Sequence, residues 1–155
     1  SFDVVFCGNA NRVVKMNVDI PVNIHLGTEE EAPSSIANPQ NLDMVTWILN
    51  QDFTSEDNGD GNGRTYTEAE IQGAIWGLTD GFIFVNPNIP NLGTTANAQE
   101  IYDLAQANGE GYEAGEGDVV ALILDPTAAA IAAGNKQPMI IGIEFDDLAQ
   151  DCLCY

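Results

Sequence analysis

Cysteine is the residue type in this sequence that most directly offers covalent chemistry. The chain has three, Cys7, Cys152 and Cys154. The thiolate is the form that attacks carbonyl groups, binds metals and exchanges disulfides. An odd number leaves at least one thiol outside any disulfide within the chain. Cys7 either pairs with one of the two C-terminal cysteines or keeps its thiol for other chemistry, and spacing alone leaves both open.

Gln72 is a second candidate, because it lies inside an apolar segment that is predicted to be a helix. Gln72, Ile75, Trp76 and Thr79 recur at the spacing of one helix face. A buried amide has to be hydrogen-bonded, or it costs about 1–3 kcal/mol. The simplest structural interpretation is therefore that Gln72 bonds to backbone groups of a neighbouring segment.

The residues around Cys7 and Gln72 resemble a known family. Phe6-Cys7 matches an aromatic-Cys start, and "IQGAIW", residues 71–76, matches a hydrophobic-Gln-x-Ala-Ile-Trp helix. Together they resemble the thioester domains at the tips of bacterial surface adhesins, and the likeness extends over roughly residues 40–80. Two positions differ: Gly8 follows the cysteine where a hydrophobic residue is usual, and Ile71 precedes the glutamine where threonine is frequent.

The resemblance implies a specific reaction between the two side chains. The Cys7 thiol would attack the side-chain amide of Gln72, ammonia would leave, and an internal thioester would form. A primary amine on a target surface protein, usually lysine, would then form an amide with Gln72 and free the thiol. The resemblance implies a covalent anchor on the bacterial cell surface that acts once, is not an enzyme and requires no cofactor. Phe6 and Trp76 are expected to shield the bond from water.

The loop before the glutamine helix is a candidate calcium site. The segment "NGDGNG", residues 58–63, resembles the first half of an EF-hand loop, although position 12 of such a loop would be Ala69 rather than glutamate. Asn-Gly and Asp-Gly are also ordinary turn formers, so a solvated loop without metal is the alternative. The candidate ligands are the carboxylate and amide side chains of Asp57, Asn58, Asp60, Asn62 and Glu68.

Charge and composition restrict the partners. The 155 residues include 24 Asp plus Glu against 4 Lys plus Arg, for a formal net charge of −20. Phosphate binding needs a basic face, so nucleic acid is excluded as a partner, whereas cations and lysine-rich surfaces are attracted. No apolar run is long enough to span a bilayer, so no membrane insertion is expected. With 45% hydrophobic residues, we expect one globular domain over residues 1–155, excised from a longer surface protein.

Hydrophobic periodicity predicts the elements that must position these side chains. Strands are expected in five segments, residues 2–7, 12–26 with an edge or break at Pro21, 81–86, 118–125 and 137–145. Helices are expected over residues 40–50, 67–78 and 96–107, and over a short Ala-rich segment that starts at Pro126. Thr67 and Glu70 form a predicted capping box. The order predicts an α+β fold, a β-sandwich or barrel with a helical insertion.

Two other functions are alternatives to the covalent anchor. The acidic loop favours a calcium-stabilised module that binds protein or glycan without a covalent bond. A metal-dependent hydrolase has little support, because His25 is the only histidine and no ligand motif accompanies it. The thioester would lower the mass of the chain by one ammonia, whereas the calcium module would keep its full mass and lose stability with a chelator.

Overall fold

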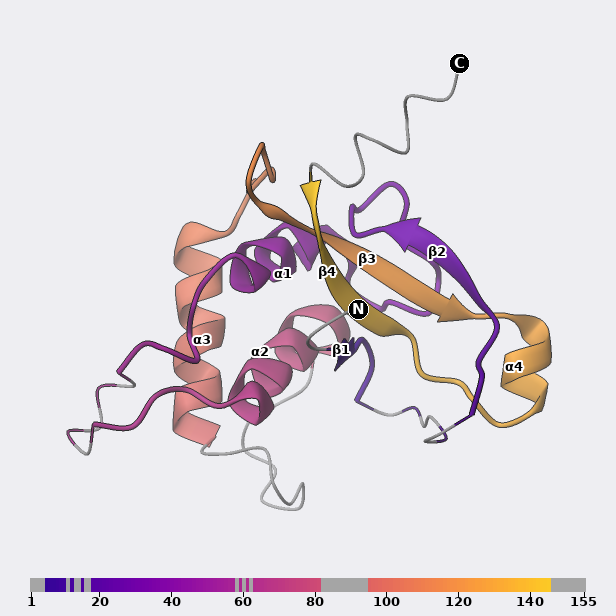
Figure 1. Cartoon of the computed structure of the whole chain (residues 1–155), viewed down its shortest axis with the longest axis horizontal. Coiled ribbons are helices and arrows are strands. Elements are labelled where there is room, and N and C mark those ends of the chain that lie inside the picture. Colours follow the sequence, from indigo (N-terminus) through magenta and orange to yellow (C-terminus); the bar gives the residue numbers. More distant parts are fainter. Residues whose placement is uncertain are drawn as a thin grey trace.

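One four-stranded antiparallel sheet forms the centre of the molecule (Figure 1). The structure, a computed structural model, describes residues 5–10, 12, 15, 18–57, 59, 61, 63–81 and 95–145. The strands are β1 (Val5–Cys7), β2 (Val22–Leu26), β3 (Val119–Pro126) and β4 (Met139–Glu144). Their order is β1-β4-β3-β2, so the first and second strands of the chain are the two edges of this sheet.

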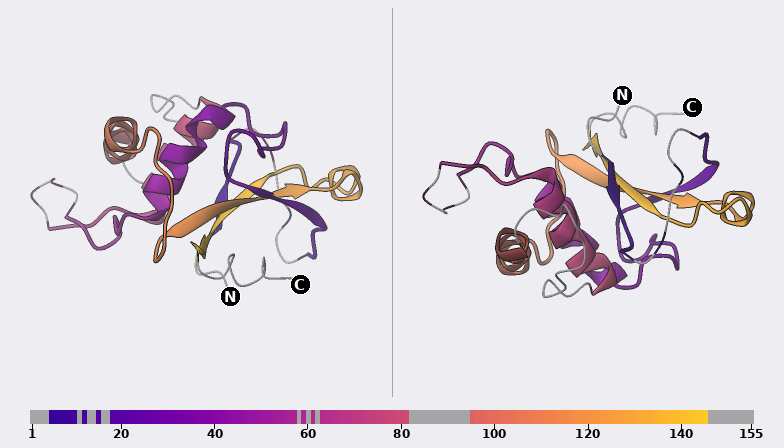
Figure 2. Two further views of the ribbon diagram at one scale, coloured as in Figure 1. Left: turned by 90° about the horizontal axis from the view of Figure 1, so that it is seen from above. Right: turned by 90° about the horizontal axis from the view of Figure 1, so that it is seen from below.

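Within the described residues, four α-helices and a short 3-10 turn accompany the sheet. They are the turn η1 (Pro39–Asn41) and the helices α1 (Leu42–Leu49), α2 (Glu68–Asp80), α3 (Thr95–Asn108) and α4 (Ala128–Ala132). The first three helices lie between β2 and β3 in the chain and gather on one face of the sheet, as both views of Figure 2 show. The predicted α+β class with a helical insertion is confirmed.

The core lies between that face of the sheet and the three helices. Side chains alternate between the two faces of a strand, and Phe6, Ala121, Ile123 and Ile140 point from the sheet into the core. The helices contribute the remaining aliphatic side chains, among them Leu42, Val45, Ile48, Ala74, Ile75, Leu78 and Ile101. The packing of these side chains brings α2 against β1, and this contact forms the site described below.

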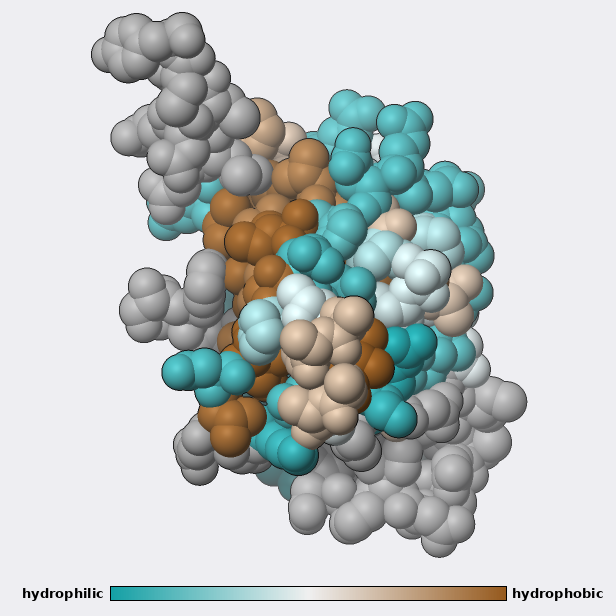
Figure 3. All heavy atoms as spheres, turned by 90° about the vertical axis from the view of Figure 1, so that its right-hand side faces the viewer, coloured by the Kyte–Doolittle hydropathy of each residue, from teal (hydrophilic) through white to brown (hydrophobic). Residues whose placement is uncertain are grey.

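The opposite face of the sheet is apolar as well, and part of it is exposed. Val5 is 47% exposed, Ile24 65% and Leu26 40%. Figure 3 shows a band of apolar surface on the side of the molecule where α4 lies. Alternation along β1 puts Cys7 on the same face as Val5, opposite to Phe6.

Most predicted elements are present with shifted boundaries, but the strand predicted over residues 12–26 is a strand only over Val22–Leu26, since the described residues before Val22 are not strand. Pro21 directly precedes the edge strand β2, as predicted. The prediction that Pro126 opens the Ala-rich helix was wrong: Pro126 ends β3 opposite Val22, and Thr127 caps α4 by accepting a hydrogen bond from the Ala130 N–H. A threonine hydroxyl satisfies a free helix N–H, which proline cannot do. The strand predicted over residues 81–86 lies mostly outside the described residues.

Candidate functional site

Cys7 and Gln72 meet at the free edge of β1. The backbone N–H of Cys7 donates to Gln72 Oε1 at 2.6 Å, and Gln72 Nε2 donates to the Cys7 carbonyl at 2.8 Å. The Gln72 amide therefore pairs with both backbone groups of Cys7, as a neighbouring strand would. This arrangement matches the structural interpretation of Gln72, and it also brings the amide carbon next to the residue that carries the thiol.

A second amide pairs with a strand in the same way, which shows that the pattern is a general device of this fold. Asn50 Nδ2 donates to the Val119 carbonyl at 2.8 Å, and the Val119 N–H donates to Asn50 Oδ1 at 2.7 Å. No cysteine stands at that position. The geometry of an amide against a strand is therefore not unique to the site, and its distinguishing feature is that the strand residue paired with Gln72 is a cysteine.

The start of α2 is fixed by local interactions. Thr67 accepts a hydrogen bond from the Glu70 N–H, and the Glu70 side chain accepts from the Thr67 N–H, so the predicted capping box is confirmed. Glu70 also accepts a hydrogen bond from Asn97 of α3 at 3.0 Å. Gly81, with φ 68°, ends the helix in the left-handed conformation. Gln72 thus extends from a helix that is held at both ends.

A second residue of α2 holds the segment after Cys7. Asp80 accepts hydrogen bonds from Asn9 Nδ2 and from the Ala10 N–H, both at 3.1 Å. Gln72 and Asp80 are eight residues apart, about two helical turns, and so lie on the same side of the helix. One helix face therefore binds residues 7, 9 and 10 at successive points.

The Cys7 thiol is half-buried and makes no disulfide within the described part of the chain. Cys152 and Cys154 lie outside the described residues. Burial raises the pKa of the Cys7 thiol above its usual value, and a hydrogen bond from the Gln137 side chain partly opposes this shift. A hydrogen-bond donor favours the charged form of a thiol.

Gln137 is a neighbour of the site that the sequence analysis missed. It lies 65 residues after Gln72, just before β4, and is 2% exposed. Only the pairing of β1 with β4 brings it to Cys7. The available signal was modest: a polar residue directly before Pro138, at the start of an apolar strand.

Phe6 and Trp76 flank the site on different sides. Phe6 is 7% exposed and points into the core, away from the Cys7 side chain. Trp76 is half-buried on α2, one turn after Gln72. Both are neighbours of the pair, and their role as shields stays a prediction.

The acidic loop shows no assembled metal site in the part that the structure describes. Asp57 Oδ1 accepts a hydrogen bond from the Gly59 N–H, which is an ordinary turn contact. Among the described residues, no three His, Cys, Asp or Glu side chains are close enough to hold a metal ion. Asn58, Asp60 and Asn62 lie outside them, so the calcium site stays a prediction.

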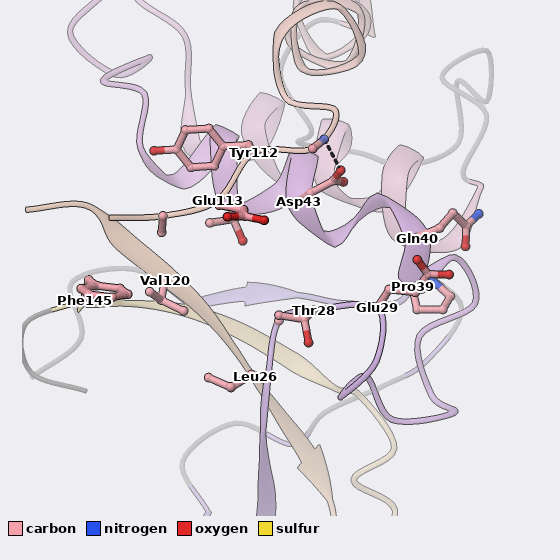
Figure 4. A pocket seen from close by; sticks show the side chains of 14 residues that line it. Leu26, Thr28, Glu29, Pro39, Gln40, Asp43, Tyr112, Glu113, Val120 and Phe145 are labelled. Atoms are coloured by element: carbon pink, nitrogen blue, oxygen red, sulfur yellow. Dashed lines mark hydrogen bonds between the residues drawn. The ribbon is translucent and has the colours of Figure 1, made fainter. Parts of the chain in front are cut away.

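A cavity of about 470 Å³ lies away from the cysteine (Figure 4). Leu26, Val120 and Phe145 line it from the sheet, and Asp43 and Tyr112 line it from the helical side. Cys7 pairs with Met139, six residues before Phe145, a separation of about 20 Å along a strand. The cavity is therefore not part of the Cys7–Gln72 site.

Comparisons with known proteins agree with the resemblance seen in the sequence. The family model of the thioester domain matches residues 4–110, which is more than half of the chain and includes Cys7 and Gln72. No curated protein and no solved structure gave a significant match. Within the described residues, no helix has both the length and the apolar character needed to cross a membrane. The chain therefore belongs to the thioester-domain family.

Proposed function

We propose that this domain forms an internal thioester between Cys7 and Gln72 and uses it to attach covalently to a target that carries primary amines. One observation supports the proposal most: both polar atoms of the Gln72 amide are hydrogen-bonded to the backbone of Cys7, which holds the two residues side by side. The match to the thioester-domain family over residues 4–110 supports it independently.

The contacts of Gln72 suit the first step, in which the bond forms. The Cys7 sulfur attacks the side-chain carbonyl carbon of Gln72, and negative charge develops on Oε1. That oxygen already accepts a hydrogen bond from the Cys7 N–H at 2.6 Å, so the donor needs no rearrangement. When the tetrahedral species collapses, the carbon–nitrogen bond breaks, and Nε2 leaves as ammonia with the proton of the thiol.

The second step exchanges sulfur for nitrogen. A primary amine attacks the thioester carbon, a carbon–nitrogen bond forms, and the carbon–sulfur bond breaks. The sulfur leaves as thiolate and takes up the proton that the amine nitrogen loses. The products are an amide between Gln72 and the target and a free Cys7 thiol. Because the acyl group is consumed, the domain acts once and is not an enzyme, and neither step needs a cofactor.

The electrostatics of the chain favour a cationic target. A net charge of −20 attracts lysine-rich surfaces and raises their local concentration. Thioester domains are associated with surface proteins and bind their targets covalently. We therefore assign the domain an extracellular role in adhesion on the bacterial cell surface, with a lysine-bearing surface protein as its partner.

Intact mass under denaturing conditions tests the proposal. The unreacted wild-type chain should weigh one ammonia less than its sequence, and it should gain one methylamine when that amine is added. Cys7→Ala and Gln72→Ala should each abolish both changes. The matched control is Gln106→Ala, because Gln106 lies on α3, is exposed, and its side chain donates to Tyr102 of the same helix. A folded wild-type chain with full mass and no methylamine uptake would overturn the proposal.

A further inference from the structure

The cavity of about 470 Å³ lies at the end of the sheet where β3 begins and β4 ends (Figure 4). Its sheet side is apolar: Leu26, Val120 and Phe145 line it, and Leu26 and Phe145 are 40% and 37% exposed. Ligand pockets have volumes of about 300–1,000 Å³ and mostly apolar walls with a few polar groups. The proposed thioester chemistry uses none of these residues, so it does not account for the cavity.

Three carboxylates complete the lining of the cavity, and each comes from a different segment. Asp43 belongs to the first turn of α1, Glu29 follows β2, and Glu113 lies in the loop after α3. Figure 4 shows Asp43 and Glu113 on the helical side of the cavity, across from Leu26. The cavity therefore combines an apolar wall with an acidic one.

The carboxylate of Asp43 is held in place by the backbone. Its Oδ1 accepts a hydrogen bond from the Met44 N–H at 2.7 Å, and its Oδ2 accepts one from the Gly111 N–H at 2.6 Å. A carboxylate oxygen has two lone pairs, so each oxygen can accept a further hydrogen bond from a ligand. Glu29 and Glu113 are exposed and can turn toward a bound group. The acidic wall thus has one fixed acceptor and two adjustable ones.

No basic side chain of the protein compensates this charge. The described residues include all four lysines and arginines of the chain, and none of the four lines the cavity. Arg12, Lys15 and Lys136 lie together around residues 133–136, before β4 and at the other end of the sheet. Negative charge in a cleft with apolar walls attracts an organic cation. The charge complement of the cavity must therefore come from a ligand.

The guanidinium group of arginine fits this lining better than an ammonium group does. Its planar fork of five donors can bond to several carboxylates at once, and it is more weakly hydrated than an ammonium. It also stacks on aromatic rings, and Phe145 offers one at the cavity. The remaining apolar wall, with Leu26 and Val120, suits an apolar side chain next to the arginine.

We propose that this cavity binds an arginine side chain and its apolar neighbour on a peptide segment of the target, and so docks the target without a covalent bond. As a docking site for the target, the inference rests on the proposed function. Cys7 is about 20 Å away along the strand direction. An extended peptide spans at most about 3.3–3.6 Å per residue, so a lysine at least about six residues from the arginine can reach the thioester.

A small peptide tests the binding itself. The probe is acetyl-leucyl-arginine amide, which has no free amine and cannot consume the thioester. In an NMR titration of the full chain, the Gly111 amide, which donates to Asp43, should shift with a Kd on the order of 1 mM. The citrulline analogue, which is neutral and of the same shape, and acetyl-seryl-arginine amide should each bind about tenfold more weakly.

A matched pair of double variants locates the site. Glu29→Gln with Glu113→Gln should weaken binding of the arginine peptide on the order of tenfold. Asp19→Asn with Glu56→Gln removes the same charge from exposed positions outside the cavity and should leave the Kd unchanged. Equal binding of the arginine and citrulline peptides, or equal effects of the two double variants, would overturn the proposal. Nuclear Overhauser contacts between Leu26 and the residues after Phe145 would assign the cavity to the chain itself and overturn it too.

A longer peptide tests the link to Cys7. Acetyl-leucyl-arginine followed by three glycyl-serine pairs and a lysine amide should consume the thioester about fivefold faster than its citrulline counterpart, at concentrations below the Kd. Removal of the six spacer residues should abolish this advantage. Binding of the short peptide without any rate advantage of the long one would overturn the docking role. A wild-type chain without ammonia loss defeats the proposed function instead, and binding of the short peptide can still be measured in that chain.

Discussion

Asp80 is the single residue that most directly holds the backbone after Cys7. It accepts hydrogen bonds from Asn9 Nδ2 and the Ala10 N–H, while Asn9 also bonds to Gln137 through its carbonyl. Loss of Asp80 therefore removes hydrogen bonds that hold residues 9 and 10, which closely follow β1, and Asn9 also contacts Gln137. A side chain two turns away from Gln72 contributes to the geometry of the reacting pair.

We predict that Asp80→Ala destabilises the domain by about 1–3 kcal/mol, the usual cost of removing the partner of partly buried polar groups. It should also lower the fraction of chains that lose ammonia, because the Cys7 segment is less well fixed. Urea unfolding and intact mass measure the two effects. Asp52→Ala is the matched control, since the Asp52 carboxylate accepts a hydrogen bond from Thr54, two residues away on the surface, and we expect a change within about 0.5 kcal/mol.

At the residue scale, sequence reasoning predicted Cys7 and Gln72 as a pair, and the structure brings the two residues into contact. Cys7 and Gln72 were recognisable because each lies in a short motif. Gln137 and Asp80 were not, because their importance depends on contacts across 128 and 71 positions of the chain. No local pattern encodes such contacts, since they arise only when β1 pairs with β4 and α2 packs against β1.

Among the elements, α2 was the most predictable from its sequence. Thr67, Glu70 and Gly81 are end signals that act within a few residues, and the helix begins and ends at them. The sheet order β1-β4-β3-β2 was not predictable, because it depends on which distant strands bury one another. Pro126 illustrates the limit: its place at the end of β3 follows from pairing with Val22, a contact across the sheet.

The cap of α2 allows a matched pair of substitutions. Thr67→Ala should cost about 1 kcal/mol of stability, since it removes the hydroxyl that accepts a hydrogen bond from the Glu70 N–H at the start of the helix that carries Gln72. Thr127→Ala removes the same kind of cap from α4, where the Ala130 N–H is the donor. Both should reduce stability in urea unfolding, but only Thr67→Ala should slow thioester formation. Equal effects of the two variants on ammonia loss would contradict a specific role of the α2 cap.

Tyr66 links the start of α2 to α3, and its ionisation should be visible in the pH dependence of stability. Burial, a hydrogen bond to Glu100 and nearby carboxylates raise the pKa of Tyr66 from 10.0 to about 12. The unfolded chain then loses the tyrosine proton at lower pH than the folded chain does. The free energy of unfolding should therefore be unaffected by Tyr66 below pH 10 and fall between about pH 10 and 12.

Urea unfolding as a function of pH checks this prediction. Tyr66→Phe should flatten the decline between pH 10 and 12, because no proton is released at that position. Tyr102→Phe is the control on α3: Tyr102 accepts a hydrogen bond from Gln106 of the same helix. The prediction fails if Tyr66→Phe and the wild type lose stability in parallel over that range.

For the molecule as a whole, net charge is the dominant feature that composition predicts. A chain of net charge −20 repels itself in the folded state more than in the expanded unfolded state, and dissolved ions screen that repulsion. We predict that the midpoint of thermal unfolding rises as sodium chloride is added from about 10 to 150 mM, over which the Debye length falls from about 30 to 8 Å. Differential scanning calorimetry measures the shift, and an unchanged or falling midpoint would contradict it.

The same measurement tests the calcium alternative. Calcium chloride and magnesium chloride at equal ionic strength screen charge equally, so any excess stabilisation by calcium reports a specific site. If the acidic loop binds calcium, Asp57→Asn and Glu68→Gln should remove the excess, whereas Glu113→Gln, in the loop after α3, should not. Equal midpoints in the two salts would leave the loop as a solvated turn.

The amide of Gln72 closes the outer edge of β1, and the proposed chemistry opens and recloses it. Nε2 donates to the Cys7 carbonyl in this structure; in the proposed thioester, sulfur would replace that nitrogen, and the carbonyl would lose its donor. The proposed amide with lysine would again carry an N–H at this position. Reaction with a target would therefore restore the hydrogen bond to the Cys7 carbonyl that thioester formation removes. We therefore expect the proposed thioester to be the least hydrogen-bonded of the three states, which would favour its reaction with an amine.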